Sequence, residues 1–457
     1  MTSQTRRDFL KRTLGIAAVS LIGPRRLLAQ KKSTRKPNIL LILTDDQGTI
    51  DVNCFGAKDL YTPNLDRLAR EGTRFTQFYV GAPICSPSRA SLMTGRYPQR
   101  AGVPGNVSST KGDAGMPAEQ VTIAEMMKSA GYATGHVGKW HLGYTPETMP
   151  NAQGYDSSFG HMGGCIDNYS HYFYWQGPNR HDLWENGKEI WREGEFFGDL
   201  MVDECKKFID ENKKKPFFLY WAINMPHYPL QGTEKWRKKY EDLPAPRKMY
   251  AAFVSTADEM IGKVLAHIEK LKLREDTIII WLSDQGHSVE QRTFSGGGSA
   301  GDFRGHKFTL WEGGIRIPCI ISQPGRIPKN AVRDQVAISI DWMPTIAEYC
   351  DAKVPDRIDG KSIVRLIDSP DAPSPHDVLH WQTGNADHWA VRQGDWKLVH
   401  NGPATDYKGR KLPTEKDFLS DMTKDTTETR NIAEDHPDIV ERLTNLHNQW
   451  LNQIQHE

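Results

Sequence analysis

A cysteine in a polar turn carries the strongest chemical signal in this chain. Residues 85–89 read Cys-Ser-Pro-Ser-Arg, and Thr-Gly-Arg follows at 94–96, whereas core cysteines usually lie among apolar neighbours. The two serines and the proline favour a helix start, where free backbone N–H groups attract an anion. Arg89 adds a permanently charged fork that suits a tetrahedral oxyanion. Taken alone, the segment fits either a nucleophile beside an anion site or a structural or reactive cysteine near a helix start.

Two pairs of oxygen-bearing side chains could hold a hard metal ion. Asp45-Asp46 follows the apolar run 38–43, and Asp284-Gln285 follows the apolar run 277–282. Carboxylate and amide oxygens suit Ca²⁺ or Mg²⁺ rather than zinc. One acidic pair often only decorates a turn, but two pairs directly after buried strands favour a metal site.

The same arrangement of an apolar run followed by reactive residues recurs twice more. The run 134–137 precedes Lys139 and His141, and the run 217–223 precedes His227. Continuous apolar runs indicate strands buried on both faces, with helical segments between them. The sequence therefore predicts an α/β fold, with a mostly parallel central sheet sandwiched by helices. Ligands bind beyond the carboxyl ends of such strands, so the four polar groups can converge there.

In combination, these motifs resemble the type I, formylglycine-dependent sulfatases of the alkaline phosphatase superfamily. Further family blocks are Gly-Lys-Trp-His-Leu-Gly at 138–143, Pro-His-Tyr-Pro at 226–229, and His306-Lys307 before Glu-Gly-Gly-Ile-Arg-Ile-Pro at 312–318. Weaker matches at 341–345 and 394–398 extend the resemblance from about residue 37 to the C-terminus.

The resemblance implies that Cys85 is oxidised to formylglycine, whose hydrate attacks sulfur and also contacts the metal. It implies Ca²⁺, with Mg²⁺ as the alternative, bound by Asp45, Asp46 and Asp284. The fourth family position is commonly Asn, and here it is Gln285. The amide oxygen is kept on a side chain one methylene longer, which leaves open whether Gln285 ligates the metal directly.

The resemblance also assigns roles to five basic side chains. Arg89, Lys139 and Lys307 are implied to hold the sulfate oxygens, and either His227 or Lys307 to protonate the leaving oxygen. His141 is implied to take a proton from the second hydroxyl of the hydrate, so that sulfate leaves and the aldehyde returns. A plain serine lacks that second hydroxyl.

The predicted substrate is a sulfated carbohydrate, with simple aryl or alkyl sulfates as the second choice. An aromatic segment at 169–175 either stacks on sugar rings or packs a long insertion. Asp167, Asn168 and His171 could hydrogen-bond sugar hydroxyls. Two alternatives remain at this stage: a phosphonate or phosphate ester hydrolase of the same superfamily, and an inactive glycan-binding homologue.

Composition excludes several other classes of protein. The 457 residues carry 58 Lys and Arg against 57 Asp and Glu, a formal charge of +1, which gives no support for nucleic-acid binding. The six cysteines contain no Cys-x-x-Cys pair, so a zinc knuckle or redox dithiol is not expected. Export would permit disulfides, but the sequence does not assign them.

The N-terminus resembles a twin-arginine signal peptide over residues 1–29. Arg6-Arg7 precedes an apolar stretch at 14–22 that is too short to span a bilayer. The alternative is a cytoplasmic protein with a basic tail. We expect a periplasmic or secreted protein without a stable membrane span, which depends on the twin-arginine translocase and on a formylglycine-generating or sulfatase-maturating enzyme.

The remaining chain divides into a predicted catalytic domain at 30–375 and a small C-terminal α+β subdomain at 376–457. In the latter, residues 390–399 indicate a hairpin around Gly394. An apolar stripe at helical spacing near the end predicts a helix that docks by one face; its residues are Ile439, Leu443, Leu446 and Trp450.

Overall fold

The apolar runs of the sequence form the middle of an eleven-stranded mixed sheet, in a computed structural model that describes residues 36–175, 177–403 and 415–456. The strand order is β12-β2-β11-β10-β1-β9-β3-β4-β7-β8, and β13 pairs with β2. The strands are β1 (Asn38–Thr44), β2 (Thr73–Tyr79), β3 (Ala133–Lys139), β4 (Ser157–His161), β7 (Trp184–Glu185), β8 (Lys188–Glu189), β9 (Phe217–Ala222), β10 (Thr277–Ser283), β11 (Arg316–Ser322), β12 (Ala331–Arg333) and β13 (Ala337–Ile338).

The five central strands, β10-β1-β9-β3-β4, run parallel to one another. Antiparallel pairing begins at β10–β11 on one side and at β4–β7 on the other. Every residue of β1, β3, β9 and β10 is buried, as the continuous apolar runs predicted. The mostly parallel central sheet is therefore confirmed, with antiparallel strands added at both sides.

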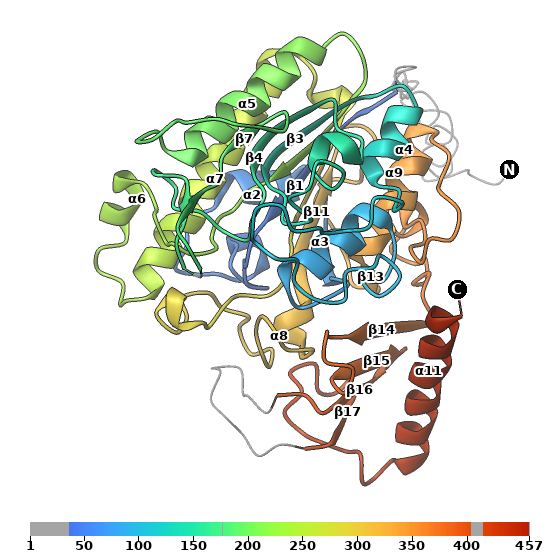
Figure 1. Cartoon of the computed structure of the whole chain (residues 1–457). Helices are drawn as coiled ribbons and strands as arrows, with labels where there is room; N and C mark the ends of the chain where they lie inside the picture. The colour runs from blue at the N-terminus through green and yellow to red at the C-terminus, as the bar shows by residue number, and fades with distance from the viewer. Residues whose placement is uncertain (1–35, 176, 404–414, 457) are drawn as a thin grey trace, which may run out of the picture. The chain divides into compact units, whose positions relative to one another are not determined.

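Helices cover both faces of this sheet (Figure 1). Alternate residues of β1 enter two separate cores: Ile39 and Leu41 pack with α3, α4 and α9, whereas Leu40 and Ile42 pack with α2, α5 and α7. The helices are α2 (Pro63–Arg70), α3 (Cys85–Thr94), α4 (Ile123–Ser129), α5 (Phe197–Asn212), α6 (Glu234–Lys239), α7 (Arg247–Lys270), α8 (Glu312–Ile315), α9 (Trp342–Cys350), α10 (Val364–Asp368) and α11 (Pro437–Gln455). The predicted helix sandwich is confirmed.

Two helix starts follow their sequence signals. Thr122 and Glu125 form a reciprocal capping box at the start of α4. The helix α3 begins at Cys85 itself, after Ile84 in extended conformation, and all ten of its residues are buried. The predicted position of Cys85 at a helix N-terminus is thus confirmed.

The C-terminal part forms a four-stranded antiparallel sheet, and the helix α11 packs against it. Its strands, in order along the sheet, are β14 (Val378–Gln382), β15 (Trp389–Gln393), β16 (Trp396–His400) and β17 (Asp417–Asp421). Val391 and Leu398 pack against Ile439 and Leu443 of α11. The predicted hairpin and docking helix are both present, whereas the exact domain boundary at 375 and 376 stays a prediction.

Short elements complete the chain. A two-stranded ladder, β5 (Tyr172–Phe173) with β6 (Arg180–His181), lies in the long insertion after β4, and 3₁₀ turns occur at Asn53–Phe55, Pro150–Gln153, Arg274–Asp276, Gln291–Thr293 and Ser339–Asp341. The predicted signal peptide at 1–29 falls outside the described residues. Over the described part of the chain, no helix has both the length and the apolar character to cross a membrane. All six cysteines are free thiols, so no disulfide forms.

Candidate active site

The carboxyl ends of four adjacent parallel strands bring the predicted reactive residues together. Thr44 at the end of β1 pairs with Ser283 at the end of β10, so Asp45 and Asp284 emerge side by side. On the other side of β1, strand β9 leads to the loop that carries His227, and Lys139 is the last residue of β3. The convergence expected from the sequence follows from this register.

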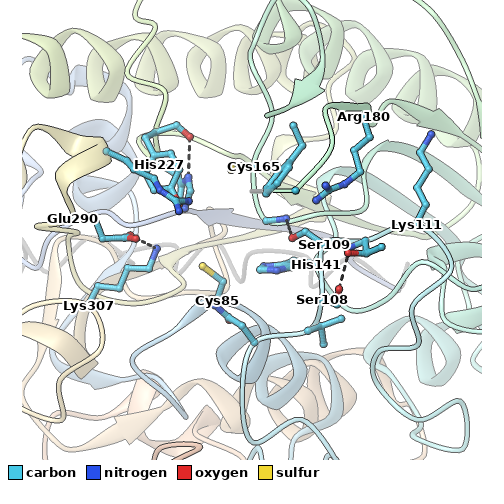
Figure 2. Close-up of a pocket in the computed structure, with 18 of the residues that line it drawn as sticks. Cys85, Ser108, Ser109, Lys111, His141, Cys165, Arg180, His227, Glu290 and Lys307 are labelled. Carbon is cyan, nitrogen blue, oxygen red and sulfur yellow. Dashed lines mark hydrogen bonds and ion pairs between the residues drawn. The ribbon is translucent and has the colours of Figure 1, made fainter. Parts of the chain in front are cut away.

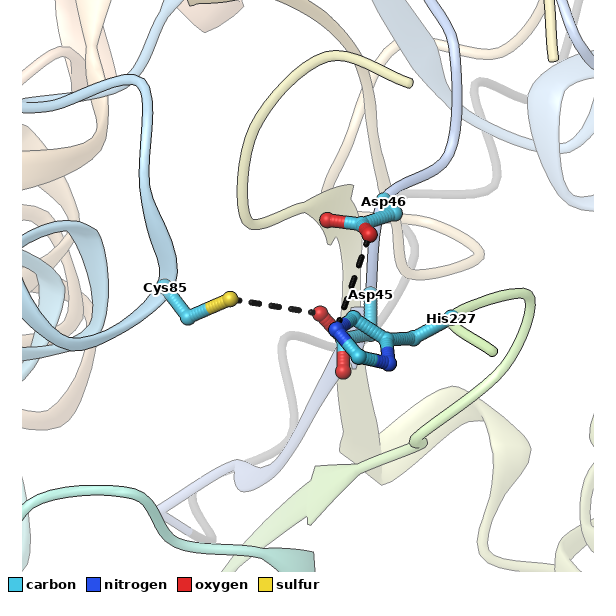
Figure 3. Close-up of side chains that lie close together, drawn as sticks. All are labelled: Asp45, Asp46, Cys85 and His227. Carbon is cyan, nitrogen blue, oxygen red and sulfur yellow. Dashed lines mark hydrogen bonds and ion pairs between the residues drawn. The ribbon is translucent and has the colours of Figure 1, made fainter. Parts of the chain in front are cut away.

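Cys85 reaches the same place from the first turn of α3. Its Sγ lies 3.8 Å from Oδ1 of Asp45. The ligand atoms of Asp45, Asp46, Cys85 and His227 all lie within 4.8 Å of one another, and all four side chains are buried (Figure 3). This group combines two hard oxygen donors, a sulfur and an imidazole nitrogen around one point.

Three buried cations hold the three carboxylates. The Nζ of Lys139 lies 2.7 Å from Asp45 Oδ2, and the Nζ of Lys307 lies 2.9 Å from Asp46 Oδ2. Arg89 donates from Nε and Nη2 to Asp284 Oδ2, at 3.2 and 2.8 Å, and from Nη1 to the carbonyl of Lys139. Formal charges therefore balance three against three at the centre.

The three neighbouring carboxyl groups, Asp45, Asp46 and Asp284, have different pKa values because they are buried close to one another. Burial, together with the charge of Asp45, raises the pKa of Asp46 to about 6, against the lowering effect of Lys307. Burial and the charge of Asp45 likewise raise the pKa of Asp284 to about 7. Burial would raise the pKa of Asp45 too, but the charges of Lys139, His227 and Arg89 hold it well below its usual range. Such like-charge repulsion is relieved when a cation binds between the carboxylates.

The amide of Gln285 fits a cation at this centre. Its Nε2 donates to Asp46 Oδ1 and lies 3.5 Å from the Sγ of Cys85. Its Oε1 is buried and has no hydrogen-bond partner among the described residues. A half-turn of the amide exchanges oxygen and nitrogen, which would aim Oε1 at the space between Asp46 and Cys85. The donor set therefore suits Ca²⁺ or Mg²⁺.

Asp284 lies beside this space rather than among the four converging groups. Its Oδ1 accepts the backbone N–H of Asp46 at 3.1 Å, and its Oδ2 is held by Arg89. His227, which the sequence singled out with Lys307 as a candidate proton donor, also lies among the potential ligands. The structure thus brings together four of the five predicted ligand positions directly, namely Asp45, Asp46, Cys85 and Gln285, and adds His227.

The two predicted catalytic histidines have different surroundings. His227 Nδ1 lies 2.9 Å from the carbonyl oxygen of Tyr228, which can only accept, so Nδ1 carries a proton. Its Nε2 then faces Asp46, 3.7 Å from Oδ2. His141 lies on the opposite side of Cys85 in left-handed backbone conformation, with φ of 56°, and its Nδ1 has no partner among the described residues. Burial lowers the pKa of both imidazoles.

A cavity of about 740 Å³ opens above this centre (Figure 2). Cys85, His141, His227 and Lys307 all line it. Lys139 and Arg89 are fully buried and are not among its lining residues. Of the three predicted sulfate-binding cations, Lys307 therefore reaches the open space, whereas Arg89 and Lys139 lie beneath it.

The predicted sugar-binding residues fold the insertion instead of lining the cavity. Asp167 accepts the backbone N–H groups of Tyr169 and Ser170. Asn168 is fully buried and hydrogen-bonds Gln231, and His171 Nε2 contacts the carbonyl of Glu195 at 3.1 Å. A polar residue in a loop often satisfies its own turn in this way, so the structure places none of Asp167, Asn168 and His171 on the cavity wall.

Other side chains form the walls, and apart from the aromatic segment 169–175 the sequence analysis did not find them. They come from the loop 106–111, from the insertion 164–180, and from the loop that holds Glu290 and Arg292. The aromatic segment contributes Phe173 to the lining, while Trp175 packs behind it. Proximity of 290–292 to the Asp284-Gln285 pair was the available signal, but it does not reveal which side chains face the substrate.

Comparisons with known proteins agree with this geometry. A family model described as "Sulfatase" matches residues 37–352, and one described as "N-sulphoglucosamine sulphohydrolase, C-terminal" matches residues 301–457. Human arylsulfatase A is 32% identical, with 90% of this chain and 87% of that protein covered. Mouse arylsulfatase J is 32% identical over 81% of this chain, which spans 65% of its length.

Two further similarities are to a protein named for a sugar sulfate and to a solved structure that contains an oligosaccharide. The N-acetylgalactosamine-6-O-sulfatase of Bacteroides thetaiotaomicron is 28% identical, with 91% of this chain and 93% of that protein covered. The crystal structure of Ps i-CgsB in complex with k-i-k-neocarrahexaose superposes with a TM-score of 0.82 at 30% identity, covering 91% of this chain and 93% of that one.

Proposed function

Because the chain belongs to the sulfatase family, whose members hydrolyse sulfuric esters, we propose that it removes sulfate from a sulfated glycan or oligosaccharide. The observation that carries the proposal is Cys85 at the start of α3, below an open cavity and beside Asp45, Asp46 and Lys307. Similarity to an N-acetylgalactosamine-6-O-sulfatase and to a structure holding a neocarrahexaose supports carbohydrate as the substrate class.

Residue 85 is proposed to act after oxidation to formylglycine, which supplies a hydrated aldehyde as the nucleophile. The N-terminus of α3 stabilises negative charge at that position. Burial raises the pKa of the unmodified Cys85 thiol to about 11, against the opposing charges of Lys139 and Lys307. The thiol itself is therefore a poor nucleophile near neutral pH, which favours a modified residue over thiolate catalysis.

Asp45, Asp46, Asp284 and Gln285 are proposed to hold Ca²⁺, or Mg²⁺, with residue 85 beside it. Such a cation supplies positive charge against the sulfate oxygens. Asp284 is fixed by Arg89 and Asp45 by Lys139. We therefore assign Arg89 and Lys139 to orienting these carboxylates as well as to neutralising charge, whereas Lys307 faces the cavity and can contact a sulfate oxygen directly.

Side chains on either side of residue 85 are proposed to transfer protons: His227 or Lys307 to the leaving oxygen, and His141 from residue 85. His227, fixed by its Nδ1–H bond to the Tyr228 carbonyl, presents Nε2 to the centre and would protonate the leaving oxygen only after taking up a second proton there as an imidazolium; Lys307, whose ammonium already carries protons, is the second candidate. His141 lines the cavity, and its Nδ1 has no partner among the described residues, which supports the proposal that it accepts a proton from residue 85.

The cellular route is proposed from the sequence alone. Residues 1–29 are proposed to direct export by the twin-arginine translocase to the periplasm or beyond, after a maturation enzyme has oxidised Cys85. The signal can be checked by N-terminal sequencing of mature protein, with Arg6-Arg7 replaced by Lys-Lys as the export-deficient control.

The activity is tested by sulfate release. The protein, co-produced with a formylglycine-generating enzyme, is incubated with sulfated oligosaccharides, an aryl sulfate and matched phosphate esters, and free anion is measured by ion chromatography. We expect release of sulfate from saccharides, and peptide mass spectrometry should find formylglycine at residue 85. Faster hydrolysis of the phosphate esters, or full activity with only unmodified Cys85, would overturn the proposal.

A further inference from the structure

An aromatic wall with an arginine at each end forms part of the cavity. The wall consists of Phe173, Trp175 and Tyr228. The ring centroids of Phe173 and Trp175 are 5.8 Å apart, those of Trp175 and Tyr228 are 5.7 Å apart, and both contacts are edge-to-face. Phe173 and Tyr228 line the cavity that contains Cys85. The three rings of the wall therefore pack directly on one another. Tyr228 follows His227 in the chain, so the wall begins beside the candidate catalytic histidine.

Arg180 and Arg292 both contact this wall, and Arg180 also donates from Nη1 to the carbonyl of Pro178 at 3.4 Å. The Cζ of Arg180 lies 3.9 Å from the ring centroid of Phe173. Arg292 donates from Nη1 to the Tyr228 hydroxyl at 3.0 Å, and its Cζ lies 5.5 Å from that ring. Among the described residues Arg292 donates this one hydrogen bond, so its other N–H groups remain available for further acceptors. Both arginines line the cavity.

The charge of the cavity lining is positive at this wall. Lys111 is paired with Glu189 at 2.7 Å, and Lys307 lies 2.9 Å from Asp46 and 3.6 Å from Glu290. Arg292, in contrast, forms no ion pair with any described carboxylate. Figure 2 shows Arg180 on the opposite side of the cavity from Lys307 and Glu290, so its charge is not placed to neutralise that carboxylate.

We propose that the aromatic wall and Arg292 bind a second anionic group of the substrate, a sulfate or a carboxylate other than the sulfate that is cleaved. A guanidinium binds either anion through two parallel N–H donors, and the aromatic wall offers an apolar surface to the sugar that carries it. The inference rests on the proposed function, since the cleaved sulfate must lie at residue 85. The preferred substrates are then polyanionic saccharides rather than singly sulfated neutral ones.

Measuring saccharide binding tests this inference independently of sulfate hydrolysis. Three saccharides of equal length are titrated calorimetrically into Cys85→Ala protein, which cannot turn them over: one singly sulfated and neutral elsewhere, one disulfated, and one singly sulfated with a uronate. We expect at least one of the two polyanionic saccharides to bind about tenfold more tightly than the neutral one, as a charge-assisted, partly exposed contact allows. The saccharide that shows the preference identifies sulfate or carboxylate as the second group.

Substitution of Arg292 tests the assignment to this wall. Arg292→Gln in the same background should remove most of the preference, Arg292→Lys should restore part of it, and Arg237→Gln, an exposed arginine on α6 outside the cavity lining, should leave it intact. The preference should also weaken at high salt. Equal affinity for all three saccharides, or an equal loss for all three in Arg292→Gln, would overturn the inference. Absence of turnover in the parent protein would overturn only the proposed function.

Discussion

Two of the buried groups of charged side chains in the described residues differ in whether they adjoin a cavity. Below α8, the Nζ of Lys397 lies 2.8 Å from Oε1 of Glu312 and 2.8 Å from Oε1 of Glu428. The other oxygen of Glu312 accepts from the Tyr79 hydroxyl at 2.7 Å and from Arg316 at 3.2 Å. This Lys397 cluster joins the first residue of α8 to β16.

At the strand ends, by contrast, buried carboxylates face one another and a cavity. Asp45, Asp46 and the sulfur of Cys85 surround a common point, and Gln285 Oε1 has no partner among the described residues. Both groups carry the cost of burying charge. The comparison teaches that burial, ion pairing and crowded like charges do not identify a functional site, because burial and the charge of Glu312 also raise the pKa of Glu428 to about 7, whereas access to a cavity does separate the two groups.

The largest effect is expected when the proposed nucleophile, residue 85, is replaced. Cys85→Ser should lower kcat for a saccharide sulfate at least ten-thousandfold, or about 5.5 kcal/mol, because serine cannot form a hydrated aldehyde. Its melting temperature should stay within about 2 °C of the parent, since the substitution is nearly isosteric. Intact-mass spectrometry should detect any sulfated enzyme that accumulates. Retention of a tenth of the parent kcat would contradict the assigned role.

The Lys397 cluster should respond in stability. Lys397→Met leaves Glu312 and Glu428 buried without their shared cation, so the free energy of unfolding should fall by about 3–5 kcal/mol. Denaturant titration measures this loss. Lys424→Met is the matched control, because Lys424 pairs with Asp421 at the surface, and it should change stability by less than about 1 kcal/mol. A comparably small effect at Lys397 would remove the contrast between the two regions.

Proton donation by His227 should appear as a dependence on the leaving group. His227→Ala is expected to lower kcat/KM about a hundredfold more for sugar sulfates than for 4-nitrophenyl sulfate, since nitrophenolate leaves without protonation. Both substrates are assayed at matched formylglycine content. Equal losses would show that His227 acts through binding or metal ligation, which its place within 4.8 Å of Asp45, Asp46 and Cys85 also permits; Lys307 would then be the better candidate acid.

The smallest effect concerns the amide at the metal site. Gln285→Asn keeps the amide oxygen and should change Ca²⁺ affinity by less than about tenfold. Asp284→Asn should weaken it further, because it removes a charge and leaves the buried Arg89 with only the more distant Asp45, at 3.7 Å. Calorimetric titration of metal-stripped protein measures both affinities, and re-addition of Ca²⁺ or Mg²⁺ should restore activity. A larger loss of Ca²⁺ affinity in Gln285→Asn than in Asp284→Asn would contradict the expectation that Asp284 contributes more to metal binding.

The centre of the fold could be predicted because its signals are local and strong. Uninterrupted apolar runs such as 39–43 and 278–282 lie in fully buried parallel strands, and the residues that follow them meet at one edge of the sheet. The start of α3 at Cys85 and the capping box at Thr122 were likewise contained in a few neighbouring residues.

The cavity wall could not be predicted because it depends on how loops fold back. Asp167 and Asn168 were expected to meet substrate, but their side chains satisfy the turn and the neighbouring Gln231. Arg180 and Arg292 are far apart in sequence and reach the same cavity through packing on Phe173 and Tyr228. Side-chain direction in an insertion leaves no periodic pattern in the sequence.

The burial of α3 sets an order of events in the life of the chain. All ten residues from Cys85 to Thr94 are enclosed by the fold, so a modifying enzyme that must grip an extended peptide around Cys85 finds no such peptide on the native protein. Under the proposed function, oxidation therefore precedes folding, and folding precedes passage through a translocase that accepts folded cargo. On this proposal, a molecule that folds with Cys85 unmodified would lack the hydrated aldehyde and would not hydrolyse sulfate esters.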